Sequence, residues 1–283
     1  MTAVELAPAV HIRGLRKSYG RLHAVSDLDL DVAYGEVVAI LGPNGAGKST
    51  TIEILEGHRR RDAGHVRVLG EDPGTADRDW RARIGIVLQD ASDFGTLTVG
   101  ETVRMFGQCY GRARTPGDVL DLVGLSRKVG ARVRTLSGGQ RRRLDVALGI
   151  IASPELLFMD EPTTGFDPEA RRQFWDLIRL LAADGTTIVL TTHYLEEAAA
   201  LADRVAVIAA GRLVAVDKPH RLTAAHATAT VRWVERGEER IVHTERPTEF
   251  IRAQAAGGGE LTGLTVTRPS LEDAYLRLIG QAS

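Results

Sequence analysis

The stretch VVAILGPNGAGKST, residues 37–50, decides the fold of this chain. It opens with Val37–Leu41, a continuous apolar run that is typical of a strand covered on both faces in a parallel sheet. A glycine-rich segment, Gly42–Gly47, follows directly and leads into a helix-like run up to Glu56. Strand, glycine-rich loop and helix in this order fit the pattern G-x-x-x-x-G-K-[ST], whose backbone N–H groups surround a phosphate. We therefore expect an α/β domain that binds a nucleotide.

The chemistry of a phosphate-binding loop explains each residue type in this pattern. Glycines let successive backbone N–H groups point at one anion, and the N-terminus of the following helix adds its positive dipole end. We expect Lys48 to reach the β- and γ-phosphates of ATP, and the Ser49 hydroxyl to ligate Mg²⁺. Chance alone would produce the pattern in about one chain in a hundred of this length, and its place between a strand and a helix makes chance rarer still. The predicted nucleotide-binding residues are Gly42, Pro43, Asn44, Gly45, Ala46, Gly47, Lys48, Ser49 and Thr50.

A carboxylate for the metal is expected at the end of a second buried strand. Leu156–Met159 is apolar and is followed by Asp160 and Glu161. We expect Asp160 to hold Mg²⁺ directly or through water. Glu161 is the candidate general base for the attacking water, a role worth about 10²–10⁴ in rate. A solvated turn explains Asp-Glu-Pro equally well by itself, so it is the combination with the Lys48 loop that favours a catalytic pair.

The rest of the chain supports an α/β fold with a mainly parallel sheet. Residues 10–32 read as extended, and the pattern between Thr98 and Ala152 is helical, which predicts a helical insert. After Lys218 the pattern weakens, and we expect a small separate α+β appendage there. Further predicted strands are Val66–Leu69, Ile84–Leu88, Thr187–Leu190 and Val205–Ile208, and further predicted helices are Pro168–Ala183 and Tyr194–Leu201.

The composition excludes several classes of protein. The 283 residues carry 36 Lys and Arg against 37 Asp and Glu, and this near-neutral balance argues against a nucleic-acid-binding protein. No segment approaches the ~18 uncharged apolar residues of a membrane span. The single cysteine, Cys109, excludes an internal disulfide framework and suits a reducing compartment. Residues 1–10 lack the pattern of a signal peptide.

The segment Leu136–Gln140, LSGGQ, distinguishes this chain from other proteins with a phosphate-binding loop. A serine cap and two glycines would form a second helix N-terminus that faces an anion. An ordinary glycine-rich helix start is the alternative for this segment alone. Because it lies between the phosphate loop and Asp160, the segment resembles the signature motif of ATP-binding cassette (ABC) ATPases. Residues from about 10 to 218 resemble the nucleotide-binding domain of that family.

The resemblance assigns roles to residues that would otherwise pass for structural ones. Tyr19 matches the aromatic residue that stacks on adenine, and Gln89 matches the Q-loop glutamine that touches Mg²⁺ and the attacking water. His193 matches the switch histidine that contacts the γ-phosphate. Asp167 matches the D-loop aspartate, although Phe166 replaces the more usual leucine. The signature residues are Ser137, Gly138, Gly139 and Gln140.

The resemblance also implies an architecture and a mechanism. The fold would be a P-loop NTPase of the ABC type, with a mainly parallel sheet core, an antiparallel β subdomain and a helical insert at about residues 92–152. This nucleotide-binding domain would span residues 1–218, and residues 219–283 would form the accessory region. Two such domains would pack head to tail, with each MgATP between the Lys48 loop of one and the Ser137 helix of the other. Phosphate loss after hydrolysis would let the dimer open. The expected partner is a second copy of this chain, and the resemblance also allows a related subunit.

A membrane partner follows from the same resemblance. Leu136–Glu169 and the tail Leu271–Gly280, LEDAYLRLIG, resemble exporters with a separately encoded ABC-2-type permease, a branch that includes antibiotic exporters of the daunorubicin type. We therefore predict an ATPase subunit at the cytoplasmic face of the cell membrane, with drug efflux as a candidate activity. The alternatives are an importer ATPase and an ABC-type ATPase outside transport. Arg141–Arg143 are predicted to be surface residues near the partner interface.

Overall fold

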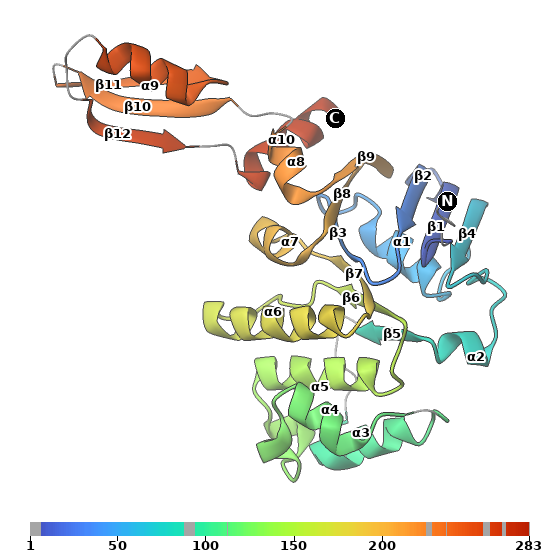
Figure 1. Cartoon of the computed structure of the whole chain (residues 1–283). Helices are drawn as coiled ribbons and strands as arrows, with labels where there is room; N and C mark the ends of the chain where they lie inside the picture. Colours follow the sequence, from blue (N-terminus) through green and yellow to red (C-terminus); the bar gives the residue numbers. More distant parts are fainter. Residues whose placement is uncertain are drawn as a thin grey trace, which may run out of the picture.

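The computed structural model describes residues 7–87, 94–111, 113–224, 228–235, 237–256, 261–267 and 270–282. Its centre is a six-stranded sheet in the order β5-β6-β7-β3-β8-β9, in which all neighbours run parallel except the antiparallel pair β8–β9. The α/β class with a mainly parallel sheet is confirmed (Figure 1). The strands are β3 Val37–Leu41, β5 Ile84–Val87, β6 Leu156–Asp160, β7 Thr187–Thr191, β8 Arg204–Ala209 and β9 Arg212–Asp217.

Strand β3 lies in the middle of this sheet and is buried along its whole length. Val37, Ala39 and Leu41 pack into one hydrophobic core, while Val38 and Ile40 pack into a second core. Because successive side chains of a strand point to opposite faces, a strand with two covered faces needs an apolar residue at every position. This explains why the run before the glycine-rich loop shows no polar alternation.

A three-stranded antiparallel sheet, in the order β2-β1-β4, covers the second core. Its strands are β1 Val10–Tyr19, β2 Leu22–Val32 and β4 Ala63–Val68. Helix α1, Lys48–Leu55, contributes Ile52 and Leu55 to the same core. The antiparallel β subdomain expected from the family resemblance is therefore present.

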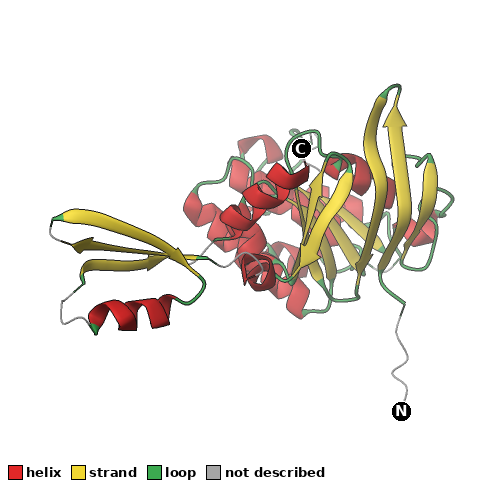
Figure 2. Cartoon of the chain, turned by 90° about the horizontal axis from the view of Figure 1, so that it is seen from above, coloured by secondary structure: helices red, strands yellow, loops and turns green. Residues whose placement is uncertain are grey.

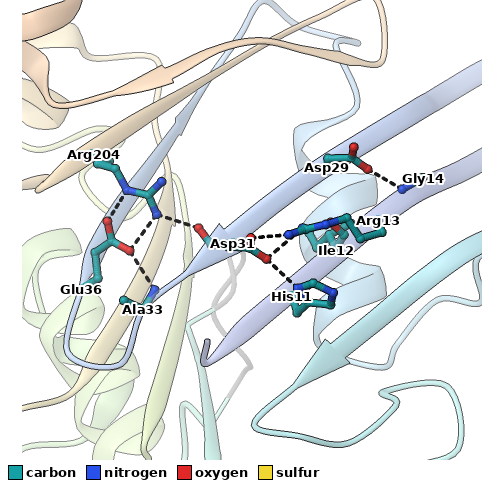
Figure 3. A network of polar contacts seen from close by, with 9 residues as sticks. All are labelled: His11, Ile12, Arg13, Gly14, Asp29, Asp31, Ala33, Glu36 and Arg204. Atoms are coloured by element: carbon teal, nitrogen blue, oxygen red, sulfur yellow. Dashed lines mark hydrogen bonds and ion pairs between the residues drawn. The ribbon is translucent and has the colours of Figure 1, made fainter. Parts of the chain in front are cut away.

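A polar network joins the two sheets (Figure 3). Arg204, at the start of β8, donates from Nε to Glu36 Oε1 at 2.5 Å and from Nη2 to the backbone oxygen of Asp31 on β2 at 2.6 Å. The Asp31 carboxylate accepts hydrogen bonds from Arg13 on β1 and pairs with His11. The hydrogen bond from Arg13 is the main reason why the pKa of Asp31 lies below its usual value. The network thus fixes the antiparallel sheet against the end of the parallel one.

The helical insert lies beyond the β5 edge of the six-stranded sheet (Figure 1). Its helices lie within residues 92–152, and Thr98 and Glu101 form a capping box at the start of the first of them. No helix among the described ranges is long and apolar enough to cross a bilayer. The helices of the insert are α3 Val99–Gly107, α4 Pro116–Leu122 and α5 Gly138–Ile150, with short 3₁₀ turns at Ser126–Lys128 and Val133–Thr135. Outside the insert, the chain up to β9 also forms the helices α2 Arg78–Arg81, α6 Pro168–Ala183 and α7 Leu195–Leu201.

The chain after β9 has two parts. Helices α8, Pro219–Ala224, and α10, Leu271–Ala282, contact each other, and α10 also contacts β8 and β9. Their side chains Leu222, Leu271 and Leu278 are buried in the core of the six-stranded sheet. Between them, strands β10 Ala229–Glu235, β11 Glu238–Thr244 and β12 Thr262–Thr267 form an antiparallel sheet in the order β11-β10-β12, on which α9, Pro247–Ala255, packs. This small α+β unit projects away from the rest of the molecule (Figures 1 and 2).

Candidate active site

The glycine-rich loop connects β3 to α1 and is closely packed at both of its ends. A Cβ atom on Gly42 would lie 2.3 Å from the Ile208 oxygen, and one on Gly47 would lie 2.2 Å from the Ala24 oxygen. Gly47 also has a φ of +101°, which an L side chain rarely adopts. No side chain caps α1 at Gly47. The first N–H groups of the helix therefore remain available to an anion.

The other loop residues divide into an exposed tip and a buried base. Pro43, Asn44 and Gly45 are exposed, whereas Ala46 is buried and Thr50 is half-buried. The exposed tip leaves room for a phosphate chain above the loop, while the buried base holds the loop in place.

The Lys48 side chain folds back over this loop. Its Nζ donates hydrogen bonds to the Gly42 oxygen at 2.8 Å and to the Pro43 oxygen at 3.2 Å. The side chain is only 7% exposed, and burial lowers the pKa of Lys48 while the charges of Glu161 and Asp160 oppose that shift. A buried ammonium held by neutral carbonyls gains from a nearby phosphate. The loop is thus suited to a polyphosphate.

The end of β6 places Asp160 next to Ser49. The Ser49 hydroxyl donates to Asp160 Oδ2 at 3.4 Å, and the Thr191 hydroxyl at the end of β7 donates to Asp160 Oδ1. Hydroxyl and carboxylate oxygens are the ligands that Mg²⁺ prefers. The two side chains predicted to share a metal therefore meet, and their chemistry fits that ion.

Glu161 lies in a left-handed backbone conformation, with a φ of +45°. Its N–H group donates to Thr191, both to the hydroxyl at 3.0 Å and to the backbone oxygen at 3.1 Å. Its Oε2 accepts a hydrogen bond from the Thr164 hydroxyl at 3.2 Å and lies 3.4 Å from His193 Nδ1. The structure thus brings the predicted base and the predicted switch histidine together. Thr164 and Thr191 were not predicted as site residues, although both lie within three residues of a predicted one.

The LSGGQ segment forms the start of α5. Ser137 is the N-cap: its Oγ accepts from the Gln140 N–H at 3.3 Å, and Gln140 Oε1 accepts from the Ser137 N–H at 3.2 Å. A Cβ atom on Gly138 would meet nothing within 4 Å, and one on Gly139 would meet only the Ala170 side chain at 3.8 Å. The two glycines therefore leave this end of the helix open.

Asp167 caps the neighbouring helix α6. Its Oδ1 accepts hydrogen bonds from the N–H groups of Glu169 at 2.9 Å and Ala170 at 2.8 Å. Phe166, the departure from the family pattern, packs edge-on against Phe174, with 5.6 Å between the ring centroids. The substituted residue therefore packs into the core of its own chain.

Tyr19 is the last residue of β1 and is 40% exposed. The Arg59 guanidinium lies 5.2 Å and Lys17 Nζ lies 5.6 Å from the centroid of its ring. A partly exposed aromatic ring can stack on a base. Gln89 lies outside the described residues.

Comparisons with known proteins agree with this geometry. The ABC transporter family profile matches residues 25–164. "Nod factor export ATP-binding protein I" of Rhizobium sp. (strain N33) is 40% identical over an alignment of 298 positions, which covers 96% of this chain and 97% of that protein. The chain belongs to the ABC transporter family. A second ABC relative, "Daunorubicin/doxorubicin resistance ATP-binding protein DrrA" of Streptomyces peucetius, is 48% identical over 212 residues, which cover 73% of this chain and 64% of that protein.

Solved ABC structures share the fold. One described as an ATP binding subunit of an ABC transporter has a TM-score of 0.72 at 22% identity and covers 95% of this chain and 99% of its own. Another, a dimeric post-hydrolysis state of an ATP-binding cassette bound to ADP and Pi, has a TM-score of 0.67 at 26% identity and covers 74% and 98%. The predicted ABC family and P-loop fold are confirmed.

Proposed function

We propose that this ABC protein is the ATP-hydrolysing subunit of an exporter and works as a dimer on a separate transmembrane subunit. The observation that carries the proposal is the meeting of Ser49, Asp160, Glu161 and His193 beside the Lys48 loop. These side chains come from α1, from the end of β6 and from the residues after β7. Phosphoryl transfer needs such a set, because its catalysis consists mainly of positioning and charge stabilisation.

Each residue has a role in this proposal. The N–H groups of residues 42–50 bind the phosphates, and Lys48 exchanges its two carbonyl partners for the β- and γ-phosphates. Ser49 and Asp160, with Gln89, hold Mg²⁺, which when bound neutralises charge that develops on the phosphates. Glu161 accepts the proton of the attacking water. His193, held against Glu161, contacts the γ-phosphate, and Tyr19 stacks on the adenine.

The open turn at Ser137–Gln140 is assigned to the second subunit's ATP. Ser137 and Gln140 satisfy each other's backbone N–H groups with their side chains. Gly138 and Gly139 leave space for a phosphate to approach the helix N-terminus. The D-loop residue Asp167 caps the adjacent helix and belongs to the same dimer surface. The similarity to a dimeric ATP-binding cassette supports a dimer of two copies, which we place head to tail as the family resemblance implies.

The membrane partner is proposed to be an ABC-2-type permease, which would place this chain at the cytoplasmic face of the membrane. The relatives named for Nod factor export and daunorubicin/doxorubicin resistance favour an exporter over an importer or an ATPase outside transport. We assign the ATPase function to residues 1–218 and treat residues 219–283 as an accessory region, with α8 and α10 anchored to the ATPase core.

The test is Glu161→Gln. We expect MgATP binding to persist, hydrolysis to fall by about 10²–10⁴-fold because the base is lost, and the ATP-bound dimer to live longer. A matched control is Glu249→Gln, which changes an exposed carboxylate on α9 and is expected to leave turnover unchanged. Unchanged turnover in Glu161→Gln would remove this residue from the role of base.

Reconstitution tests the exporter part. A hydrophobic membrane protein encoded beside this chain, placed with it in vesicles, should couple ATP hydrolysis to movement of its cargo out of the cytoplasmic side. If the membrane protein did not change the rate of ATP hydrolysis, the result would favour an ATPase outside transport.

A further inference from the structure

Arg142 is buried, although the run of three arginines on α5 predicts a solvated surface. Its side chain is only 7% exposed, whereas Arg141 and Arg143 are half-buried. Arg141 donates to the Val133 oxygen at 3.0 Å, and Arg143 binds the Gln173 side chain. The surface prediction is therefore wrong for Arg142, because this side chain points from α5 towards the end of β6.

The guanidinium of Arg142 binds the backbone on both sides of Glu161. Its Nε donates to the Pro162 oxygen at 3.0 Å, and its Nη2 donates to the Asp160 oxygen at 2.9 Å. Glu161, between these two carbonyls, has a φ of +45°, a conformation that costs a non-glycine residue about 1–2 kcal/mol. Such a conformation persists only where the surroundings fix it. Arg142 on one side and Thr191 on the other supply that fixation.

Burial of the Arg142 guanidinium costs free energy that a solvent-exposed arginine would not lose. Burial lowers the pKa of Arg142, and the charges of Asp145, Asp160 and Glu197 oppose this shift. A lysine could supply the charge, but the planar fork of arginine can span two neighbouring carbonyls in a fixed geometry. The residue type therefore matches the task of holding a short backbone segment.

We infer that Arg142 is a positioning residue for Glu161. The inference rests on the proposed role of Glu161 as base and deepens it. Arg142 is the fifth residue of α5, and about one and a half turns of helix, about 7.5 Å, separate it from the open end at Ser137. The same rigid helix thus presents Ser137 to the second subunit's ATP and holds the base of its own site. Helix α5 therefore connects the surface that meets one nucleotide to the base that activates the water attacking the other.

Arg142→Lys tests this inference in the full chain, with Arg143→Lys as the matched control. The lysine keeps the positive charge but loses the fork, so kcat should fall about tenfold while the KM for ATP changes less than about twofold. Arg143→Lys should leave both constants within about twofold of the wild type. A wild-type kcat in Arg142→Lys would overturn the positioning role. So would a rise in the KM for ATP by the same factor as the fall in kcat.

A double-mutant cycle separates positioning from folding. If Arg142 acts through Glu161, then Arg142→Lys should have little further effect on the residual hydrolysis of Glu161→Gln. A full tenfold loss in that background would show that Arg142 acts independently of the base and would refute the inference. Unchanged turnover in Glu161→Gln alone would refute the proposed function instead, so the two failures are distinguishable.

Discussion

Glu56 is a buried carboxyl whose replacement should stabilise the protein at neutral pH. It follows α1, is 5% exposed, and its Oε2 lies 3.2 Å from His58 Nδ1. Burial, with the charges of Asp160 and Glu53, raises the pKa of Glu56 to about 8. A glutamine of nearly the same shape keeps a hydrogen-bond acceptor and can never ionise.

The expected magnitude follows from this pKa. At about pH 7 the folded protein keeps the Glu56 proton, whereas the unfolded chain, with a pKa of 4.5, has lost it. The difference of about 2.5 pH units, at about 1.4 kcal/mol each, amounts to up to about 3 kcal/mol of lost stability. Because the folded state binds the proton more tightly, stability from this group is complete below pH 4.5. It falls as the pH rises towards about 8 and then stays level.

Urea unfolding of the nucleotide-free protein measures this effect. Glu56→Gln should raise the free energy of unfolding by up to about 3 kcal/mol at about pH 7, and the gain should vanish near about pH 4.5. The matched control is Glu53→Gln, because Glu53 is a more exposed carboxylate paired with Arg59 and should change stability by less than about 1 kcal/mol. A pH-independent difference, or a loss of stability at about pH 8 in Glu56→Gln, would refute the reasoning.

Three further substitutions test the packing of the loop and the junction between the sheets, all by urea unfolding. Gly47→Ala places a Cβ 2.2 Å from the Ala24 oxygen and should lower the free energy of unfolding by more than about 3 kcal/mol. In Gly45→Ala the new Cβ meets nothing within 4 Å, so only the backbone strain of about 1–2 kcal/mol should be lost. Equal losses would contradict the packing argument. Arg204→Met removes the guanidinium from Glu36 Oε1 and from the Asp31 oxygen and should cost about 2–3 kcal/mol. A loss below about 0.5 kcal/mol would mean that the network does not hold the sheets together.

The sequence predicted the parts of the site that are local in the chain. The run Val37–Leu41 was sufficient to predict a buried strand, because a strand with two covered faces needs an apolar residue at each position. The Lys48 loop was predictable because residues close in sequence surround one phosphate. Helix α6 has its predicted bounds, since Asp167 caps it and Pro168 opens it. Where the signal was weaker, the bounds moved: β4 begins at Ala63, three residues before the predicted start.

The parts that were not predicted depend on contacts between distant segments. Thr191 reaches Asp160 only because β6 and β7 are neighbours in register, which the strand patterns do not specify. Arg142 reads as one of three equivalent arginines, and only the packing of α5 on the end of β6 distinguishes it. The packing of Leu278 into the main core was likewise not predictable, because the chain first passes through the small sheet and then returns.

Complementation between two inactive variants tests the shared ATP site most directly. Lys48→Ala removes the phosphate-binding side of a site, and Ser137→Arg blocks the side supplied by the other subunit. A mixed dimer of the two keeps one complete site, so the mixture, each chain also carrying Glu161→Gln, should form ATP-dependent dimers in light scattering while neither variant does so alone. Failure of the mixture to dimerise at every ratio, or unimpaired dimers of Ser137→Arg by itself, would contradict a site built from two chains.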